Sequence, residues 1–521
     1  MGKNKNNQMK KKSISFFIIC CIVLLYVAGI GCTNNETLPS LANTYYVASN
    51  GDDNNEGSID SPFRSIAMAL DKANPGYTIL VREGVYNEKI VFPRSGEASS
   101  PITLKAYPGE NSIIDGTGLS VSKKEALVTI RNVKHITFEG FDVCNYKSAT
   151  PYVIVNGFTV DQGSENIIIR NNKIYNIEHN VSPENGRNGH GIEVIGNTNV
   201  ALRNILIEGN EIHDCNTGYS ENLTINGYVD GFIVRKNKVY NGENIGIVAA
   251  GGYAANSVPA LNYARNGVIS DNEVFNIDGT SGPIPAYSQH NGAIGIYVDG
   301  ARDIIVERNK VYDSGRGIGI VSETNNFPTE NCIVRNNFVY SNSLAGIYLG
   351  GYVDYTTGGT INCAVVNNTL YFNNKNLGYS NEIEGEIRLT ENCVKNVIKN
   401  NIIFARQNRG VFINKQTMGG SDNSIDNNLY YSQILYKWVW NGTLYTNFTD
   451  WQSACDGDKS SVINKDPQFL DLDIPDIHIS NTSPAKNKGA VISLSVNGET
   501  DIDGNPRVIN NKIDIGANQT N

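Results

Sequence analysis

The stretch IIRNNKIY, residues 168–175, decides the fold because its pattern returns along most of the chain. The pattern is an apolar residue, two variable residues, an asparagine, one variable residue, an apolar residue and an aromatic one. Spacings of 38, 27, 35, 37, 28, 31, 33 and 27 residues separate the asparagines, which are Asn172, Asn210, Asn237, Asn272, Asn309, Asn337, Asn368, Asn401 and Asn428. A period that varies around a constant phrase is typical of a solenoid with loop insertions.

The apolar positions of each repeat alternate, which is the period of a β-strand. A second apolar strand follows in each repeat, with predicted starts at Gly191, Asn222, Gly246, Gly295, Gly317, Gly346 and Glu386. Asparagine at the fixed position suits a left-handed turn, and amides stacked ~4.8 Å apart can bond one another. The repeats resemble the right-handed parallel β-helix, the fold of many polysaccharide lyases and some glycoside hydrolases. We therefore predict an all-β, right-handed parallel β-helix with a short N-terminal capping helix.

The N-terminus has the pattern of a secretion signal. Five lysines precede an apolar run from Phe16 to Ile30, which is too short for a comfortable membrane span, and Gly31 and Cys32 follow. This pattern resembles a bacterial lipoprotein signal at residues 1–31, with Cys32 as the lipid-bearing residue and residues 32–43 as a tether. The resemblance implies anchoring to the bacterial outer membrane, at the cell surface or the periplasmic face. Plain secretion is the alternative.

Charge narrows the choice of partner. The formal net charge is −9, and removal of the five lysines in residues 1–31 would make it −14. An acidic protein without a dense basic face is a poor ligand for nucleic acid. We expect a monomer that binds a polysaccharide and meets the membrane only through its lipid. Cys332 and Cys363 share a repeat position, which favours stacked buried thiols over metal ligands.

The region before the repeats predicts a cap for the solenoid. Ser61-Pro62 can begin a helix whose apolar face holds Ile66, Ala69 and Leu70. Residues 44–120 are similar to the N-terminal part of the family 6 and family 9 polysaccharide lyases. We expect the β-helix to span residues 44–431. Residues 432–521 look like a segment found on many bacterial β-helix proteins, and we expect them to pack on the solenoid or cap it.

Four long insertions predict a groove. Those at residues 176–190 and 278–293 precede a second strand, and those at 250–265 and 351–361 follow one. Loops on both sides would form two walls, with the second strands as the floor. Such a groove suits a linear polymer.

The candidate site residues point outward from this floor or lie at its ends. A lyase that cleaves an acidic, uronate-containing polysaccharide by β-elimination must neutralise a carboxylate, remove a proton and protonate the leaving oxygen. We assign Arg265 and Arg316 to the charge and Tyr297 or His290 to the proton. Asp299 and Glu323 would orient them or hold Ca²⁺. The expected substrate-binding residues are Glu193, Asn226, Tyr348, Arg388 and His190.

Other functions remain open on the sequence. In the resemblance to family 9, Asp230 precedes a Gly-Phe pair as the calcium-binding Asp does, but the following turn offers only Glu243 and no base lysine matches. The polygalacturonase-like pattern is met only by Gly189-His190-Gly191. A hydrolase using a carboxylate pair such as Glu193 and Asp230 is one alternative. A glycan-binding protein without catalysis is another.

Overall fold

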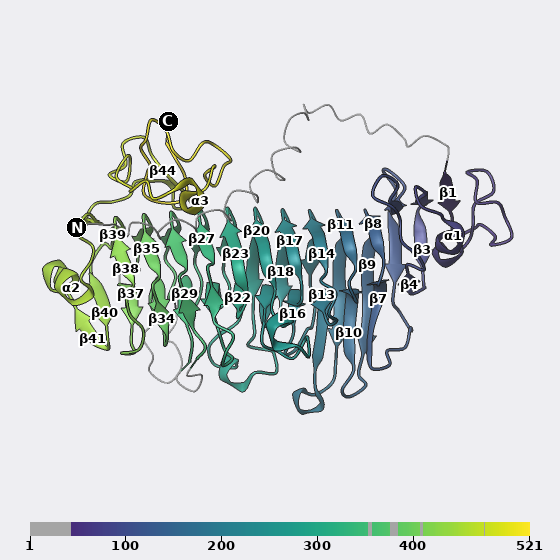
Figure 1. Cartoon of the computed structure of the whole chain (residues 1–521), viewed down its shortest axis with the longest axis horizontal. Helices are drawn as coiled ribbons and strands as arrows, with labels where there is room; N and C mark the ends of the chain where they lie inside the picture. Colours follow the sequence, from purple (N-terminus) through teal and green to yellow (C-terminus); the bar gives the residue numbers. More distant parts are fainter. Residues whose placement is uncertain (1–42, 353–356, 376–383, 407–409, 474, 521) are drawn as a thin grey trace, which may run out of the picture. The chain divides into compact units, whose positions relative to one another are not determined.

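Short parallel strands stack into three long sheets, and each turn of the chain gives one strand to each sheet (Figure 1). In the computed structural model, the described residues are 43–352, 357–375, 384–406, 410–473 and 475–520. The lipidation predicted at Cys32 therefore lies outside the described residues, as does the predicted signal. Most strands pair with the strand three or four further along the chain, as β10 (Ile154–Asp161) does with β13 (Asn188–Gly196). This is the predicted right-handed parallel β-helix.

The strands of the three sheets are as follows. The first sheet holds β1 (Thr44–Val47), β2 (Thr78–Val81), β5 (Ile102–Ala106), β8 (Lys134–Glu139), β11 (Glu165–Arg170), β14 (Arg203–Glu208), β17 (Asp230–Arg235), β20 (Arg265–Ser270), β23 (Arg302–Glu307), β27 (Ile333–Arg335), β31 (Ala364–Val366), β35 (Val397–Lys399) and β38 (Ser424–Asp426), with β26 (Thr329–Glu330), β30 (Thr360–Ile361) and β34 (Cys393–Val394) beside it. The second, which we call the floor sheet, holds β4 (Ile90–Val91), β7 (Lys124–Arg131), β10, β13, β16 (Glu221–Gly227), β19 (Ile245–Ala250), β22 (Ile294–Asp299), β25 (Arg316–Val321), β29 (Ile347–Gly350), β33 (Ile387–Leu389), β37 (Val411–Lys415), β40 (Lys437–Trp440) and β41 (Thr443–Tyr445). The third holds β3 (Gly84–Tyr86), β6 (Ser112–Asp115), β9 (Asp142–Ser148), β12 (Lys173–His179), β15 (Glu211–His213), β18 (Lys238–Gly242), β21 (Glu273–Ile277), β24 (Lys310–Tyr312), β28 (Phe338–Tyr340), β32 (Thr369–Tyr371), β36 (Ile402–Phe404), β39 (Leu429–Tyr431) and β42 (Val462–Ile463).

The asparagine ladder is present at the corner between the first and third sheets. The Asn237 side-chain amide donates to Asn272 Oδ1 at 3.0 Å, and the backbone N–H of Asn237 donates to the same oxygen at 2.9 Å. The residue with left-handed backbone conformation was predicted to be the ladder asparagine itself. It is instead the residue before that asparagine, for example Arg308 with φ 53°. That residue turns the corner, which frees the following asparagine to point into the stack. The ladder ends at Asn428, whose backbone N–H donates to Ser461 Oγ at 2.9 Å.

Apolar side chains fill the interior, and rings stack on the third sheet. Ile and Val from all three sheets form one continuous buried core. His213 lies between Tyr175 and Tyr240, with ring centroids 5.2 and 4.9 Å apart, as its place in the aromatic column predicts. All six cysteines of the described residues are buried and free, and the Cys332 N–H donates to Cys363 Sγ at 3.2 Å.

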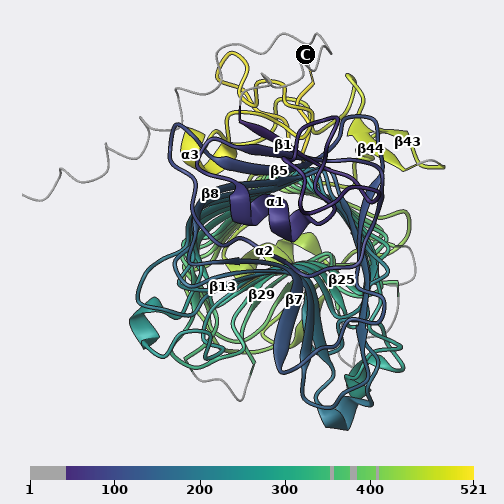
Figure 2. The ribbon, with the colours of Figure 1, turned by 90° about the vertical axis from the view of Figure 1, so that its right-hand side faces the viewer.

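Two short helices lie at the ends of the strand stack. Helix α1 (Ile66–Lys72) lies over the first coils and buries Ile66 and Leu70 (Figure 2). It begins at the Ser65 cap and not at Ser61-Pro62, because the Ser65 hydroxyl accepts the Met68 N–H. Helix α2 (Phe448–Cys455) follows the final floor strands, and its Trp451 ring stacks on Trp438.

The remaining C-terminal residues contact the outside of the coils. They include β43 (Phe469–Asp471), β44 (Asp476–Ile479) and α3 (Leu494–Asn497). Arg335 donates to the Ser495 carbonyl at 2.6 Å, and the Asn336 amide donates to the Asn497 carbonyl at 3.0 Å. Within the described part of the chain, no helix is long and apolar enough to cross a membrane.

Candidate functional site

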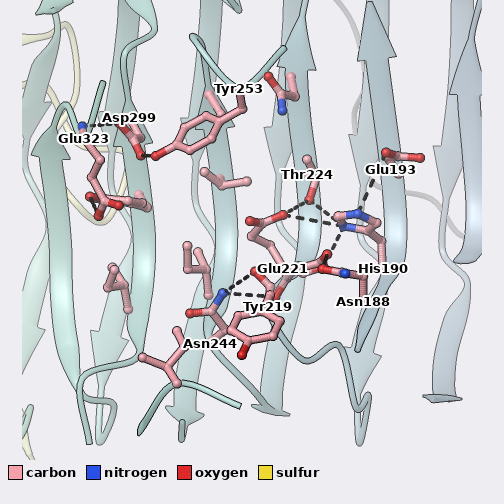
Figure 3. A pocket seen from close by; sticks show the side chains of 18 of the residues that line it. Asn188, His190, Glu193, Tyr219, Glu221, Thr224, Asn244, Tyr253, Asp299 and Glu323 are labelled. Carbon is pink, nitrogen blue, oxygen red and sulfur yellow. Dashed lines mark hydrogen bonds and ion pairs between the residues drawn. The ribbon is translucent and has the colours of Figure 1, made fainter. Parts of the chain in front are cut away.

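A pocket of about 450 Å³ lies on the outer side of the floor sheet (Figure 3). Its base is formed by outward residues of β13, β16, β19 and β22, where the strand register brings Glu193, Thr224, Val248 and Tyr297 into one row. The full lining is Asn188, His190, Glu193, Tyr219, Ser220, Glu221, Thr224, Asn226, Asn244, Ile245, Val248, Ala250, Tyr253, Ile284, Tyr287, Ile294, Tyr297, Asp299 and Glu323.

Loops on both sides of the floor strands form the walls. Tyr253 belongs to the insertion at 250–265, which follows β19. Ile284 and Tyr287 belong to the insertion at 278–293, which precedes β22 and contains a 3₁₀ turn at Pro285–Tyr287. The predicted arrangement of two loop walls over a strand floor is therefore confirmed at these coils.

One side of the pocket holds a pair of carboxyl groups. Asp299 ends β22 with 2% of its surface exposed, and its Oδ1 accepts the backbone N–H of Glu323 at 3.0 Å. The Tyr253 hydroxyl donates to Asp299 Oδ2. Glu323 follows β25, and its Oε1 accepts the Tyr297 hydroxyl at 2.7 Å. Three successive coils thus bring two carboxyl groups and two tyrosines together.

Burial sets the protonation of this group. It raises the pKa of Asp299 well above its ordinary value, and the charge of neighbouring Glu323 adds to the effect. Burial also raises the pKa of Glu323, against the hydrogen bond from Tyr297 and the charge of Arg316. The pKa of Tyr297 rises well above its usual range for the same reason. Tyr297 therefore keeps its hydroxyl proton and donates a hydrogen bond to Glu323.

The other side of the pocket holds His190, Glu193, Glu221 and Thr224 (Figure 3). The Thr224 hydroxyl lies 2.9 Å from His190 Nδ1 and 2.8 Å from Glu221 Oε2. Glu193 Oε1 accepts the ammonium of Lys124 at 2.5 Å, an ion pair with 5% of the Glu193 side chain exposed. Burial raises the pKa of Glu221, and the opposing charge of His190 is a smaller effect.

The structure brings together only part of the predicted site. The predicted residues that line the pocket are Tyr297, Asp299, Glu323, Glu193, Asn226 and His190. Five others do not line it, namely His290, Arg316, Arg265, Tyr348 and Arg388.

The arginines are placed differently because other groups hold them. Arg265 lies on β20 of the first sheet, with its guanidinium 3.6 Å from the centre of the Tyr263 ring. Arg316 and Arg388 both bond Glu384 Oε1, at 3.0 and 2.6 Å. Neither arginine lines the pocket, although the charge of Arg316 opposes the rise that burial causes in the pKa of Glu323, which does line it.

The hydrolase pair predicted from Glu193 and Asp230 is also not formed at this site. Asp230 begins β17 of the first sheet and accepts the Asn266 amide at 2.7 Å. Of the two, only Glu193 lines the pocket. The carboxyl pair that the fold brings together is Asp299 with Glu323, because they end consecutive floor strands.

Sequence reasoning missed Tyr253, Tyr287, Glu221 and Lys124. The tyrosines lie in long insertions without periodicity, so no pattern shows which way they face. Glu221 lies one residue before the predicted strand start at Asn222. Extending that strand by one residue would have placed Glu221 in register beside His190, and this was the available signal. Lys124 lies two coils before Glu193 in the sequence. Their contact could be predicted only if the exact lengths of both coils were known.

Calcium fits this donor set poorly. Among the described residues, no group of three or more His, Cys, Asp or Glu side chains is placed to hold a metal ion. Both Asp299 oxygens already accept hydrogens, from the Glu323 amide and the Tyr253 hydroxyl. A cation needs those lone pairs and would repel those donors. No step of the chemistry below depends on a metal.

Comparison with known proteins places this architecture in a family. The model described as "Pel9A-like, right handed beta helix region" matches residues 45–257. "Uncharacterized protein YwoF" of Bacillus subtilis (strain 168) is 32% identical over 444 residues, which are 85% of this chain and 92% of that protein. The chain belongs to the Pel9A-like right-handed β-helix family.

Two further relatives show how broad the likeness is. "Pectate lyase PEL9" of Emericella nidulans is 46% identical to this Pel9A-like chain over 81 residues, or 15% of this chain and 20% of that enzyme. The crystal structure of GH136 lacto-N-biosidase from Eubacterium ramulus is 14% identical, with a TM-score of 0.52 over 75% of this chain and 68% of that one. The structural likeness shows the fold alone.

Proposed function

We propose that this protein cleaves a polysaccharide by hydrolysis of its glycosidic bonds, with Asp299 and Glu323 as the two carboxyl groups. The observation that carries this proposal is the charge of the pocket. Four carboxyl residues line it, namely Glu193, Glu221, Asp299 and Glu323, while none of its described lining residues is lysine or arginine. Where these carboxyl groups are ionised they disfavour a uronate, whereas the hydroxyl groups of a neutral sugar can donate hydrogen bonds to them.

Two carboxyl groups in different environments can divide the work of hydrolysis. Asp299 keeps its proton because burial and the neighbouring charge raise its pKa. Glu323 accepts a hydrogen bond from Tyr297, which stabilises its charged form. We therefore assign Asp299 as the acid and Glu323 as the carboxylate of the pair.

The reaction follows from these roles. Asp299 gives its proton to the glycosidic oxygen, and the bond between that oxygen and the anomeric carbon breaks. The Glu323 carboxylate stabilises the positive charge that develops on the anomeric carbon. Water then adds its oxygen to that carbon, and the proton it loses returns to the carboxyl pair. Tyr253 and Tyr297 hold the two carboxyl groups in place.

A second candidate is the lyase expected from the sequence, which would cleave an acidic polysaccharide by β-elimination. The Pel9A-like match over residues 45–257 supports it, as does the short segment shared with a pectate lyase. In that reaction a protonated Asp299 would bond the uronate carboxyl group, because the described residues that line the pocket include no lysine or arginine.

One experiment separates the two candidates. The purified protein is incubated with neutral polymers, such as xylan, β-glucan and β-mannan, and with uronic-acid polymers, such as polygalacturonate and alginate. New reducing ends and the ultraviolet absorbance of a 4,5-unsaturated uronate are recorded together. We expect reducing ends from a neutral polymer without absorbance. Absorbance from a uronic-acid polymer would establish the lyase. No signal in either assay would indicate a glycan-binding protein without catalysis.

A further inference from the structure

The hydrogen bonds of His190 fix which ring nitrogen carries its proton. Nδ1 lies 3.2 Å from the Glu221 carbonyl oxygen, which can only accept. Nδ1 also lies 2.9 Å from the Thr224 hydroxyl, whose own proton goes to Glu221 Oε2 at 2.8 Å. Both neighbours therefore require N–H at Nδ1. In the neutral ring this leaves Nε2 as a bare acceptor.

His190 Nε2 and Glu193 Oε1 form a pair of hydrogen-bond acceptors. Among the described residues, the polar neighbour of Nε2 is Glu193 Oε1 at 3.8 Å, which is beyond hydrogen-bonding reach. Glu193 Oε1 also accepts the Lys124 ammonium at 2.5 Å, and the other Glu193 oxygen accepts the Asn156 amide at 2.9 Å. His190 and Glu193 both line the pocket. Two acceptors this close call for a ligand with two donors side by side, as neighbouring hydroxyl groups of a sugar ring are.

The register gives the distance from this pair to the carboxyl groups. His190 lies on β13, and Asp299 lies three floor strands further along, on β22. Strands are ~4.8 Å apart, so the two strands are about 14 Å apart along the stack, and Asp299 lies in register with Ile195, two residues past Glu193. One pyranose unit of an extended glycan has nearly the length of one such step.

We propose that His190 Nε2 and Glu193 Oε1 form a subsite that accepts two neighbouring hydroxyl groups of a neutral pyranose, about three sugar units from the bond to be cleaved. The distance to that bond rests on the proposed function, whereas sugar binding at the subsite does not. The chain thereby selects a glycan with free adjacent hydroxyl groups, lying along the floor sheet. A uronate carboxylate at this subsite would lie against the Glu193 carboxyl group, which disfavours its binding.

Binding tests the subsite without relying on cleavage. The Asp299→Asn protein and the Asp299→Asn, His190→Phe protein are titrated calorimetrically with hexasaccharides from xylan, cellulose, β-mannan and polygalacturonate. At least one neutral hexasaccharide should bind, and His190→Phe should weaken it about tenfold, the effect of one lost hydrogen bond. His213→Phe is the matched control, since His213 stacks outside the pocket and should leave the affinity unchanged.

A second measurement does not depend on a variant that folds. In protein labelled with ¹⁵N-histidine, His190 Nε2 should resonate as an unprotonated nitrogen and shift when the sugar is added. The proposal is overturned if Nε2 carries the proton, if His190→Phe binds as tightly as its parent, or if only the polygalacturonate fragment binds. Cleavage by the Asp299→Asn protein would instead refute the assigned acid and leave the subsite standing.

Discussion

At the scale of the residue, the protein depends on carboxyl groups that the fold has removed from water. Asp299 is 2% exposed, yet both of its oxygens have hydrogen-bond donors. Burial costs the charged form more than the neutral one, so the pKa of Asp299 rises well above its ordinary value. Under the proposed function, this burial is what makes Asp299 the acid.

Replacing this acid tests the assignment directly. Asp299→Asn removes the proton that the leaving group needs and should lower the cleavage rate about 10²–10⁴-fold. The melting temperature should stay about equal, because asparagine, like the protonated acid, carries no charge at this buried position. Rates are measured on the polymer found to be cleaved. Asp303→Asn, an exposed position on β23, is the control and should keep full activity. Equal rates in both variants would contradict the role of Asp299.

The positions of individual side chains could be predicted only for residues that lie within the repeat. Asp299 and Tyr297 lie on a floor strand, so alternation alone placed them on the outer face. Arg316 was assigned to the same face, but the sequence held no sign that Glu384 would bind it. Tyr253 lies in an insertion without a period, and its contact with Asp299 follows from loop packing that no local pattern encodes.

At the scale of the element, the asparagine rows hold one coil to the next. Asn309 accepts the Asn272 backbone N–H at 3.0 Å and its amide at 2.9 Å, and its own amide donates to the Ile269 carbonyl at 3.0 Å. It is fully buried. Groups left without partners at this place cannot turn to water.

Removal of one rung should therefore be costly. Asn309→Ala leaves the Asn272 N–H and the Ile269 carbonyl unpaired and should lower the free energy of unfolding by about 2–4 kcal/mol. Urea unfolding followed by circular dichroism measures this loss. Asn54→Ala, at an exposed turn, should change the free energy by less than about 0.5 kcal/mol. A ladder variant as stable as the turn variant would show that the rungs contribute little.

A second, shorter row ends in an acid and makes stability depend on pH. Asn342 donates to Asn373 Oδ1 at 2.8 Å, and Asn373 donates to Glu386 Oε2 at 2.7 Å. Burial raises the pKa of Glu386 to about 8. The folded state therefore binds this proton more tightly than the unfolded chain, whose value is about 4.3.

The sign of the pH effect follows from that difference. Stability from Glu386 is complete below pH of about 4.3 and falls as the pH rises toward and through about 8, by about 1.4 kcal/mol for each pH unit in between. Glu386→Gln, which cannot ionise, should match the wild type near pH 4 and exceed it at pH 8. Thermal unfolding across this range tests it, and parallel curves for the two proteins would contradict the raised pKa.

At the scale of the whole molecule, the sequence was most informative. A repeat that recurs nine times averages out local ambiguity, so strands, coil order and loop walls could all be predicted. The site could not be fixed to the same degree, because fold and chemistry are encoded in different residues. Inward Ile, Val and Asn fix the coils, whereas the outward residues are free to vary with the substrate.

The predicted calcium is tested on the intact protein. The donors already bonded to Asp299 lead us to expect that a chelator such as EDTA changes neither the melting temperature nor the cleavage rate. Adding Ca²⁺ after the chelator should also change neither quantity, and Mg²⁺ is added in parallel as the control. A loss of activity with EDTA that Ca²⁺ alone reverses would establish the calcium site predicted from Asp299 and Glu323.

The direction of the ladder bears on how the chain is made. Each ladder asparagine donates to the next one in the sequence, as Asn237 does to Asn272, and Asn428 ends the series on Ser461. A coil leaving the ribosome thus keeps the backbone N–H of its ladder asparagine unpaired until the next coil emerges. Folding of each coil would be completed only when the next has been made, and the backbone N–H of Asn428 is bonded by Ser461, which follows some thirty residues later. A nascent chain stopped at any earlier coil would present an unfinished edge to which another chain could add.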